Sequence, residues 1–229
     1  MGIKERKERD FQKREEKILE GAKKIFLKTG TLHATMDMIA KEVEIGRTTL
    51  YLHFKNKDEM MAKILSDWYK DLRASLSESD KLKFTLEQIR FIIRGYLNYC
   101  IANPEEYFLH KAIESSLQKE NLSKKILKEL DDERKERIEL LENVYHKARI
   151  EGLVGNTPVY FLVGTAWGML RGAIDVIIEN HFAKEISDKE KFFQFVEKVF
   201  FDGILLKETS NGKKIQNKIN GKKQIIAKS

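Results

Sequence analysis

Apolar residues recur at intervals of three and four along most of this chain, which is the spacing that places them on one face of an α-helix. Only two prolines and thirteen glycines interrupt its 229 residues. We therefore expect an all-α fold rather than a strand-rich one. The predicted helices cover approximately residues 14–28, 36–43, 47–54, 57–74, 85–102, 105–120 (one helix or two), 124–151 and 158–179, with a last helix after Ser187.

The segments between these helices divide the chain into four predicted parts. Residues 1–13 are too highly charged to pack and form an N-terminal arm or a frayed helical extension. Residues 14–74 form a DNA-binding domain that consists of a three-helix helix-turn-helix module and the helix after it. A polar stretch from Ser75 to Asp80 then leads into a larger helical domain, residues 75–206. Residues 207–229 form a basic tail that we expect to be mobile.

Two short amphipathic helices, 36–43 and 47–54, are joined by a break of three residues. So brief a connection forces them to cross steeply, with Ala40 where they come closest and Ile45 pinning the turn to the core. The second helix then directs five polar or aromatic side chains away from the core. They are Arg47, Thr48, Thr49, Tyr51 and His53. A helix of this kind fits the major groove of DNA.

This segment resembles the tetracycline-repressor (TetR) family of bacterial regulators. The resemblance is carried by Thr35 with Ile39-Ala40, by Thr49-Leu50-Tyr51 with Phe54, and by Lys55-Asn56-Lys57 with Glu59. It covers roughly residues 14–74 and implies a TetR-type DNA-binding domain there.

The resemblance also implies the role of each residue at the DNA. Thr35 and Lys57 would meet phosphates near helix N-termini, and Tyr51 would reach the backbone. Bases would be read by Arg47, Thr48 and Thr49. The full set of predicted DNA contacts is Thr35, Arg47, Thr48, Thr49, Tyr51, His53, Lys55 and Lys57.

Two positions depart from the family pattern. Glu44 stands in the turn where family members usually have glycine, and Gly46 stands where they have a capping residue such as serine. Because a left-handed residue other than glycine costs about 1 kcal/mol, we expect a differently shaped turn here.

The larger domain carries apolar helix faces with a few hydroxyl and imidazole groups, which suits a lipophilic or aromatic ligand. The residues concerned are Tyr96, Tyr99, Cys100, Tyr107, Phe108, His110, Thr165, Trp167 and Met169. Each of them could equally be an ordinary core residue. The TetR resemblance implies an inducer pocket between these helices and leaves the inducer unidentified.

Glycine recurs every four residues inside the helix that begins at Pro158, at Gly164, Gly168 and Gly172. Each costs roughly 0.8–1 kcal/mol relative to alanine, so the stripe suggests the close approach of another helix. The last helix has more apolar surface than one neighbour would cover, at Phe192, Phe195, Val196, Val199 and Phe200. We expect the two helices to form half of a four-helix bundle in a homodimer, as TetR-like proteins do. Alternatively, the glycines face a helix of the same chain or the ligand pocket.

Charge is concentrated at the two ends of the chain. Residues 1–57 hold 14 Lys/Arg and 9 Asp/Glu, and residues 207–229 hold 7 and 1, whereas the middle is mildly acidic. Basic ends indicate contact with a polyanion, most simply nucleic acid, although charge runs are also ordinary solvated faces. We expect no apolar run long enough to cross a membrane, and a charged N-terminus unlike a signal peptide, so we predict a cytoplasmic protein.

The sequence offers little for catalysis. The single cysteine, Cys100, lies on an apolar helix face, and no histidine follows a glutamate in the Glu-x-x-His pattern of di-iron bundles. Phosphate-binding, dinucleotide, serine-hydrolase and zinc-protease motifs are also missing from the sequence. We therefore predict neither an enzyme nor a metal or cofactor site.

These patterns favour a ligand-responsive transcriptional regulator. We expect a repressor that binds a pseudo-palindromic operator as a homodimer and leaves it when a lipophilic or aromatic molecule binds. The alternative is a helical adaptor protein whose basic ends touch membrane or RNA, and such a protein would show no DNA sequence preference.

Overall fold

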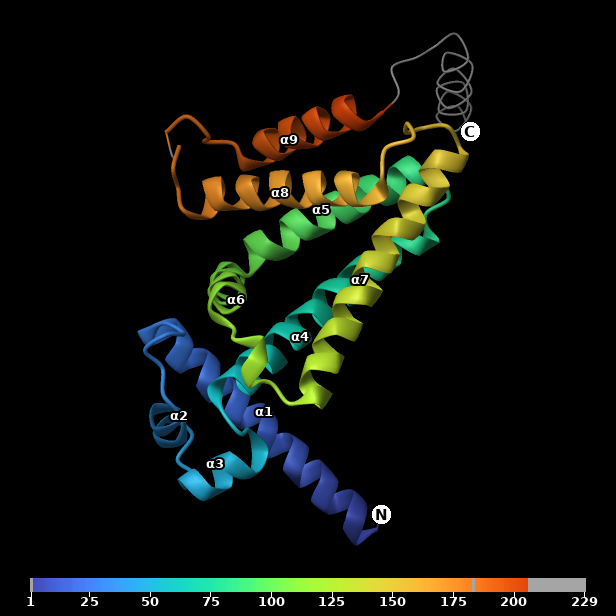
Figure 1. Ribbon diagram of the computed structural model, residues 1–229. Helices are drawn as coiled ribbons and strands as arrows, with labels where there is room; N and C mark the ends of the chain where they lie inside the picture. Colours follow the sequence, from blue (N-terminus) through green and yellow to red (C-terminus); the bar gives the residue numbers. More distant parts are fainter. Residues whose placement is uncertain (1, 183, 206–229) are drawn as a thin grey trace, which may run out of the picture. The chain divides into compact units, whose positions relative to one another are not determined.

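The regular elements of the protein are helical in every part that the structure describes. The computed structural model describes residues 2–182 and 184–205 (Figure 1), and within them the only strand-like feature is an isolated bridge between Val154 and Leu205. The helices are α1 (Ile3–Thr29), α2 (Met36–Glu42), α3 (Arg47–His53), α4 (Lys57–Leu76), α5 (Thr85–Ala102), α6 (Pro104–Ser116), α7 (Lys124–Ile150), α8 (Val159–Ile178) and α9 (Lys189–Ile204), with 3-10 helices η1 (Ser77–Lys81) and η2 (Lys119–Asn121). The predicted all-α fold is confirmed. The basic tail, residues 207–229, lies outside the described residues.

Packing divides the chain into two compact units that do not follow chain order. The first unit contains residues 1–78 and 98–139, and the second contains residues 79–97 and those from 140 onward. Helices α5 and α7 therefore each contribute one end to each unit.

The first unit is built around α1 and α4. Helix α1 packs against α2, α4 and α6, while α3 packs on α2. The apolar positions that helical spacing predicts to be buried here are buried, with one exception, and they are Ile18, Leu19, Ala22, Ile25, Phe26, Ile39, Val43, Leu50, Phe54, Met60, Met61, Ile64, Leu65, Trp68 and Leu72. The exception is Met38 of α2, which is only half-buried. The helical period read from the sequence is therefore sufficient to orient α1, α3 and α4.

Helix α1 begins at Ile3 rather than near Arg14, so the predicted charged arm is helical. Its first turn is closed by the Gly2 N–H group, which donates to the Glu5 carboxylate at 3.0 Å. Lys, Arg, Glu and Gln are good helix formers, and the buried part of α1 supplies a nucleus from which the helix extends.

Gly21 allows α1 and α2 to approach each other closely. A Cβ atom at this position would overlap the Cγ1 atom of Val43. Ala40 was predicted as the point of closest approach between α2 and α3, whereas the close approach of α1 to α2 at Gly21 was not predicted from the sequence.

The predicted linker at residues 75–80 is folded. Helix α4 continues to Leu76, and η1 follows at once with the Ser79 side chain fully buried. A polar composition alone did not distinguish a 3-10 turn from an extended linker.

In the second unit, α8 lies along α9 (Figure 1), with Leu170, Ile174, Phe193, Val196 and Phe200 buried. Hydrogen bonds connect α5 to α9. Arg90 and Arg94 of α5 both donate to the buried carboxylate of Glu197 on α9, each at 2.5 Å. Two guanidinium groups compensate this carboxylate for its loss of water.

The expectation that no apolar segment is long enough to cross a membrane is wrong for α8. Among the described helices it alone is long and apolar enough to cross a membrane, with a mean hydropathy of 1.5 over 18 residues. Core helices of soluble proteins pass the same test, but only 28% of this window is buried. Its exposed residues are three glycines, three aromatic residues and one threonine, namely Tyr160, Phe161, Gly164, Thr165, Trp167, Gly168 and Gly172.

Candidate nucleic-acid interface

The turn between α2 and α3 keeps the shape that the expected glycine would give it. Glu44 adopts a left-handed conformation, with φ of 56°, and the Ile45 N–H group donates to the Ala40 carbonyl at 3.0 Å. The expectation of a differently shaped turn is therefore wrong. Packing of α2 on α1 and of α3 on α2 holds Glu44 in this conformation at a cost of about 1 kcal/mol.

The two short helices differ in how they begin. The Thr35 hydroxyl accepts a hydrogen bond from the Met38 N–H group at 3.3 Å, so the predicted cap of α2 is present. Helix α3 begins after Gly46, which has no side chain to offer, and its first N–H groups have no side-chain cap. This end of the helix is open to solvent, because Gly46, Arg47 and Thr48 are all exposed.

Helix α3 turns one face inward and leaves the other to solvent. Leu50 is fully buried, whereas Arg47, Thr48, Tyr51 and Leu52 are exposed. Thr49 is only half-buried, so of the three predicted base-reading residues it is the least accessible.

Leu52 is 73% exposed and was not among the predicted contacts. A position two residues after Leu50 lies about 200° around the helix, so the period could have identified it. An exposed leucine on such a helix can contact the methyl group of thymine.

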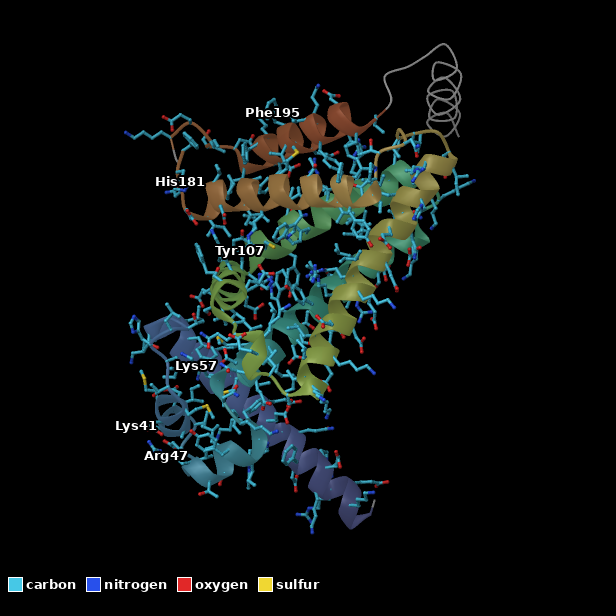
Figure 2. All side chains as sticks on the ribbon, in the orientation of Figure 1. Lys41, Arg47, Lys57, Tyr107, His181 and Phe195 are labelled. Atoms are coloured by element: carbon cyan, nitrogen blue, oxygen red, sulfur yellow. The ribbon has the colours of Figure 1, made fainter. Side chains whose placement is uncertain are left out.

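Arg47 is paired within the protein. Its guanidinium forms an ion pair with Asp37 at the start of α2, and both side chains remain largely exposed. Figure 2 shows Lys41 and Arg47 at the outer edge of the α2–α3 pair. Because an exposed pair of this kind contributes little stability, Arg47 can exchange Asp37 for a base or phosphate at low cost.

His53, another predicted contact, is engaged by α1. Its ring stacks on the ring of Phe11, with centroids 4.1 Å apart. Burial lowers the pKa of His53 from its usual 6.5, and the positive charge of Arg14 lowers it further. The imidazole is therefore neutral at pH 7, which does not favour a phosphate contact.

Lys57 binds the loop that precedes α2. Its ammonium group donates to the carbonyl oxygens of Thr31, Leu32 and Ala34 at 2.8, 3.0 and 3.3 Å. This role was not predicted from the sequence. Lys55 is exposed, while its backbone N–H group donates to the Glu59 carboxylate at 3.0 Å and helps to start α4.

The segment after α6, residues 116–121, is hydrogen-bonded to the start of α4 and to the loop before α2. The buried Asp58 carboxylate accepts from the Gln118 N–H group at 3.2 Å and from the Asn121 amide at 2.8 Å. The Asn56 amide donates to the Asn121 carbonyl at 3.0 Å, and Ser116 donates to the Thr31 hydroxyl at 2.8 Å. The beginning of α4 and the loop before α2 are thus both attached to residues 116–121.

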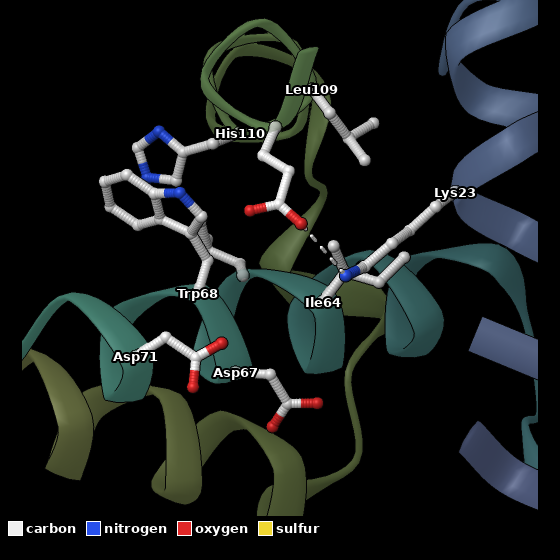
Figure 3. Close-up of a pocket in the computed structure, with 9 residues that line it drawn as sticks. Lys23, Ile64, Asp67, Trp68, Asp71, Leu109 and His110 are labelled. Carbon is white, nitrogen blue, oxygen red and sulfur yellow. Dashed lines mark ion pairs between the residues drawn. The ribbon is translucent and has the colours of Figure 1, made fainter. Parts of the chain in front are cut away.

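A small hollow lies between α1, α4 and α6 (Figure 3), with about 360 Å³ of empty space that opens to solvent. Trp68 and His110 form one wall, their rings stacked with centroids 3.9 Å apart. Lys23 and Glu106, 3.9 Å apart, form another. His110 is the one predicted pocket residue that lines this hollow.

The other predicted pocket residues divide between the two units. Tyr99, Cys100, Tyr107 and Phe108 belong to the first, where Cys100 and Tyr107 are fully buried and Phe108 is exposed. The second contains Tyr96, Thr165, Trp167 and Met169. Thr165 and Trp167 are exposed on α8, and the Arg171 guanidinium lies 5.1 Å from the Trp167 ring centroid.

The predicted dimer residues also divide by burial. Gly164, Gly168 and Gly172 are exposed, and a Cβ atom at each would meet no other atom within 4 Å. Phe195 and Val199 are exposed as well, whereas Val196 and Phe200 are buried in the second unit and Phe192 is half-buried. Val196 and Phe200 are therefore core residues of the protomer, because they lie on the inner face of α9 with Phe193.

Known proteins resemble this chain most clearly in the DNA-binding region. Residues 18–64 match the sequence model of the bacterial regulatory proteins of the tetR family. A stretch of 66 residues, 29% of the chain, is 36% identical to YhgD of Bacillus subtilis, an uncharacterised HTH-type transcriptional regulator. The match spans 35% of that relative, about a third of its length.

Solved structures resemble the chain over most of its length. The fatty acid degradation regulator FadR from Bacillus halodurans superposes with a TM-score of 0.63 at 15% identity, over 82% of this chain and 94% of that one. AibR, in complex with isovaleryl coenzyme A and operator DNA, gives 0.63 at 18% identity, over 82% and 98%. At these identities the likeness shows that the fold is shared.

Proposed function

We propose that this chain is a TetR-family regulator, specifically a homodimeric, cytoplasmic repressor that a lipophilic or aromatic molecule releases from a pseudo-palindromic operator. We assign DNA binding to residues 14–74, and effector binding and dimerisation to residues 75–206. No catalytic role is proposed.

The exposed face of α3 carries the proposal. Arg47, Thr48, Tyr51 and Leu52 project from a helix whose opposite face is fixed by the buried Leu50. Guanidinium, hydroxyl and apolar groups on one helix face can read base edges in a major groove.

Selection of duplexes from a random-sequence library by the full-length protein tests DNA recognition. A repressor of this kind enriches an inverted repeat, and Thr48→Ala with Leu52→Ala relaxes the preference within each half-site. Thr29→Ala, away from the exposed face of α3, serves as the control. A helical adaptor would enrich no sequence, and that outcome would reject the proposal.

The second unit supports the proposed dimer. Its exposed surface on α8 and α9 includes Tyr160, Phe161, Trp167, Phe195 and Val199, each more than 40% exposed, beside the three open glycines. So many large apolar side chains are rarely left to solvent on two adjacent helices, and a second copy related by a two-fold axis would cover them with the same residues.

The hydrogen bonds to residues 116–121 supply a route by which an effector could change DNA affinity. A ligand that shifts α6 moves residues that Asp58 and Asn56 hold at the start of α4. The ligand then changes operator affinity by as much as it prefers one arrangement, typically about 1–3 kcal/mol.

Release by a ligand is tested by measuring operator affinity with three kinds of probe. The probes are isovaleryl coenzyme A, free fatty acids of graded length and aromatic amphiphiles. We expect at least one probe both to raise the melting temperature and to weaken operator binding. Asn121→Ala should reduce that coupling without abolishing ligand binding. If every stabilising probe leaves operator affinity unchanged, the protein is not released by ligands of this class.

A further inference from the structure

The first turns of α1 form a projection beside the recognition helix. Phe11 stacks on His53, the last residue of α3, with ring centroids 4.1 Å apart and planes inclined by 28°. From this contact α1 continues to its first residue, Ile3, past the end of α3 (Figure 1). The packing of α1 on α2, α4 and α6 sets the direction of this helical extension, and the ring contact attaches it a second time, beside α3.

The projection is basic and exposed. Residues 2–14 contain six Lys/Arg and three Asp/Glu, and all their described side chains are exposed, Arg6 at 79%. Lys4 and Lys7 lie on the same helix face as Phe11 and Arg14, at spacings of three and four residues. Within the described part of the chain, neither Lys4 nor Lys7 forms an ion pair.

We propose that this projection, residues 3–14, is a second DNA-contact surface that binds the phosphate backbone outside the base pairs facing α3. Lys4 lies about 10 Å further along α1 than Phe11, given a rise of 1.5 Å per residue. That distance corresponds to about three base pairs of B-DNA. The contact involves phosphates rather than bases, because lysine on a straight helix offers point charges without a bidentate geometry.

A lipid surface fits the projection less well. A membrane-binding helix needs a broad apolar face, and the one large described apolar side chain in residues 2–14, Phe11, is occupied by His53. Charge complementarity and continuity with α3 both favour DNA.

The inference rests on the proposed function. An experiment that varies the length of the duplex distinguishes failure of the inference from failure of the proposed function. The selected operator is prepared in two forms, one trimmed to the enriched motif and one extended by about ten base pairs, roughly one helical turn, at each end. The full-length protein and Lys4→Ala/Lys7→Ala are titrated with both duplexes over a range of salt concentrations. Lys147→Ala/Lys184→Ala, which removes two exposed charges from the second unit, is the matched control.

On the extended duplex, the Lys4→Ala/Lys7→Ala variant should bind roughly tenfold more weakly near 0.15 M salt, with a salt slope lower by nearly two units for each bound protomer, or nearly four for the dimer. On the trimmed duplex it should bind like the unmodified protein. The Phe11→Ala variant retains every charge. Its affinity should rise less than that of the unmodified protein when the duplex is extended, because the projection is held less firmly beside α3.

If extension strengthens binding equally for both proteins, or not at all, the projection does not contact flanking DNA, while operator recognition by α3 still stands. If no motif is enriched at all, the proposed function fails and this inference fails with it.

Discussion

The ring of Phe11, in the third turn of α1, stacks on the ring of His53 at the end of α3, with centroids 4.1 Å apart. Neither residue marks this contact in the sequence, where Phe11 stands alone among charges and His53 looks like a side chain available to DNA. The contact links the N-terminal turns of α1 to the helix proposed to read the operator.

His53 should titrate below the usual histidine range. Burial and the charge of Arg14 lower its pKa from 6.5, so the folded protein resists protonation that the unfolded chain accepts. Stability from this site is complete above pH 6.5 and is lost as the pH falls through the folded pKa. NMR titration of the His53 ring measures this, with Arg14→Gln expected to raise the pKa. A pKa at or above 6.5 would contradict the neutral, stacked state, and His53→Gln should flatten the pH dependence of stability.

Replacing Glu44 with glycine should stabilise the protein by about 1 kcal/mol. Glu44 has φ of 56°, where glycine avoids the steric cost that a side chain incurs. Glu42→Gly, at the end of α2, is the control and should destabilise, because glycine is a poor helix former. Urea unfolding compares the two variants, and an unchanged or lower midpoint for Glu44→Gly would show that the turn carries no strain.

Gly21→Ala should disrupt the helix-turn-helix module. The added methyl group would overlap Cγ1 of Val43, and such overpacking costs about 1–3 kcal/mol. Both the unfolding free energy and operator affinity should fall. The double variant Gly21→Ala/Val43→Ala should recover part of the operator affinity, because the space for the new methyl is restored. Equal losses in the single and double variants would place the effect elsewhere.

Lys57→Ala distinguishes a phosphate contact from a role in holding the loop. Loss of the three carbonyl contacts should reduce stability by about 1–3 kcal/mol and weaken binding to all duplexes. If Lys57 also meets a phosphate, the salt slope should fall by about one unit for each bound protomer, or about two for the dimer. An unchanged slope with lower stability would assign Lys57 to the loop alone, whereas unchanged stability would reject the role in the loop.

Gly168→Leu should prevent dimerisation while leaving the protomer folded. The site is open in the protomer, so the new side chain meets no atom of its own chain within 4 Å of Cβ and would instead separate two copies. Light scattering should report monomers, with weak operator binding and retained helical circular dichroism. Lys128→Leu, on exposed α7, adds the same side chain elsewhere and should remain dimeric. A dimeric Gly168→Leu protein would show that the glycine stripe lies outside the interface.

The sequence by itself determined the helices and the inner face of most of them. Helical period is a local property, and the free energy of burying Leu50, Phe54 or Trp68 depends mainly on their spacing along one helix. The same period could have identified Leu52 as exposed. Helical period also predicted that the polar residues of α3 share its outer face. The resemblance to a DNA-binding family rests partly on residues of this helix.

Tertiary structure decided which polar groups are already engaged within the protein. Phe11 is 42 positions from His53, Lys57 donates to a loop 23 to 26 positions away, and Asp58 accepts from residues 60 and 63 positions away. The left-handed turn at Glu44 likewise depends on packing that outweighs a local preference of about 1 kcal/mol. Local propensities cannot anticipate such contacts, because each depends on how helices distant in sequence pack together and not on the spacing of residues within any one of them.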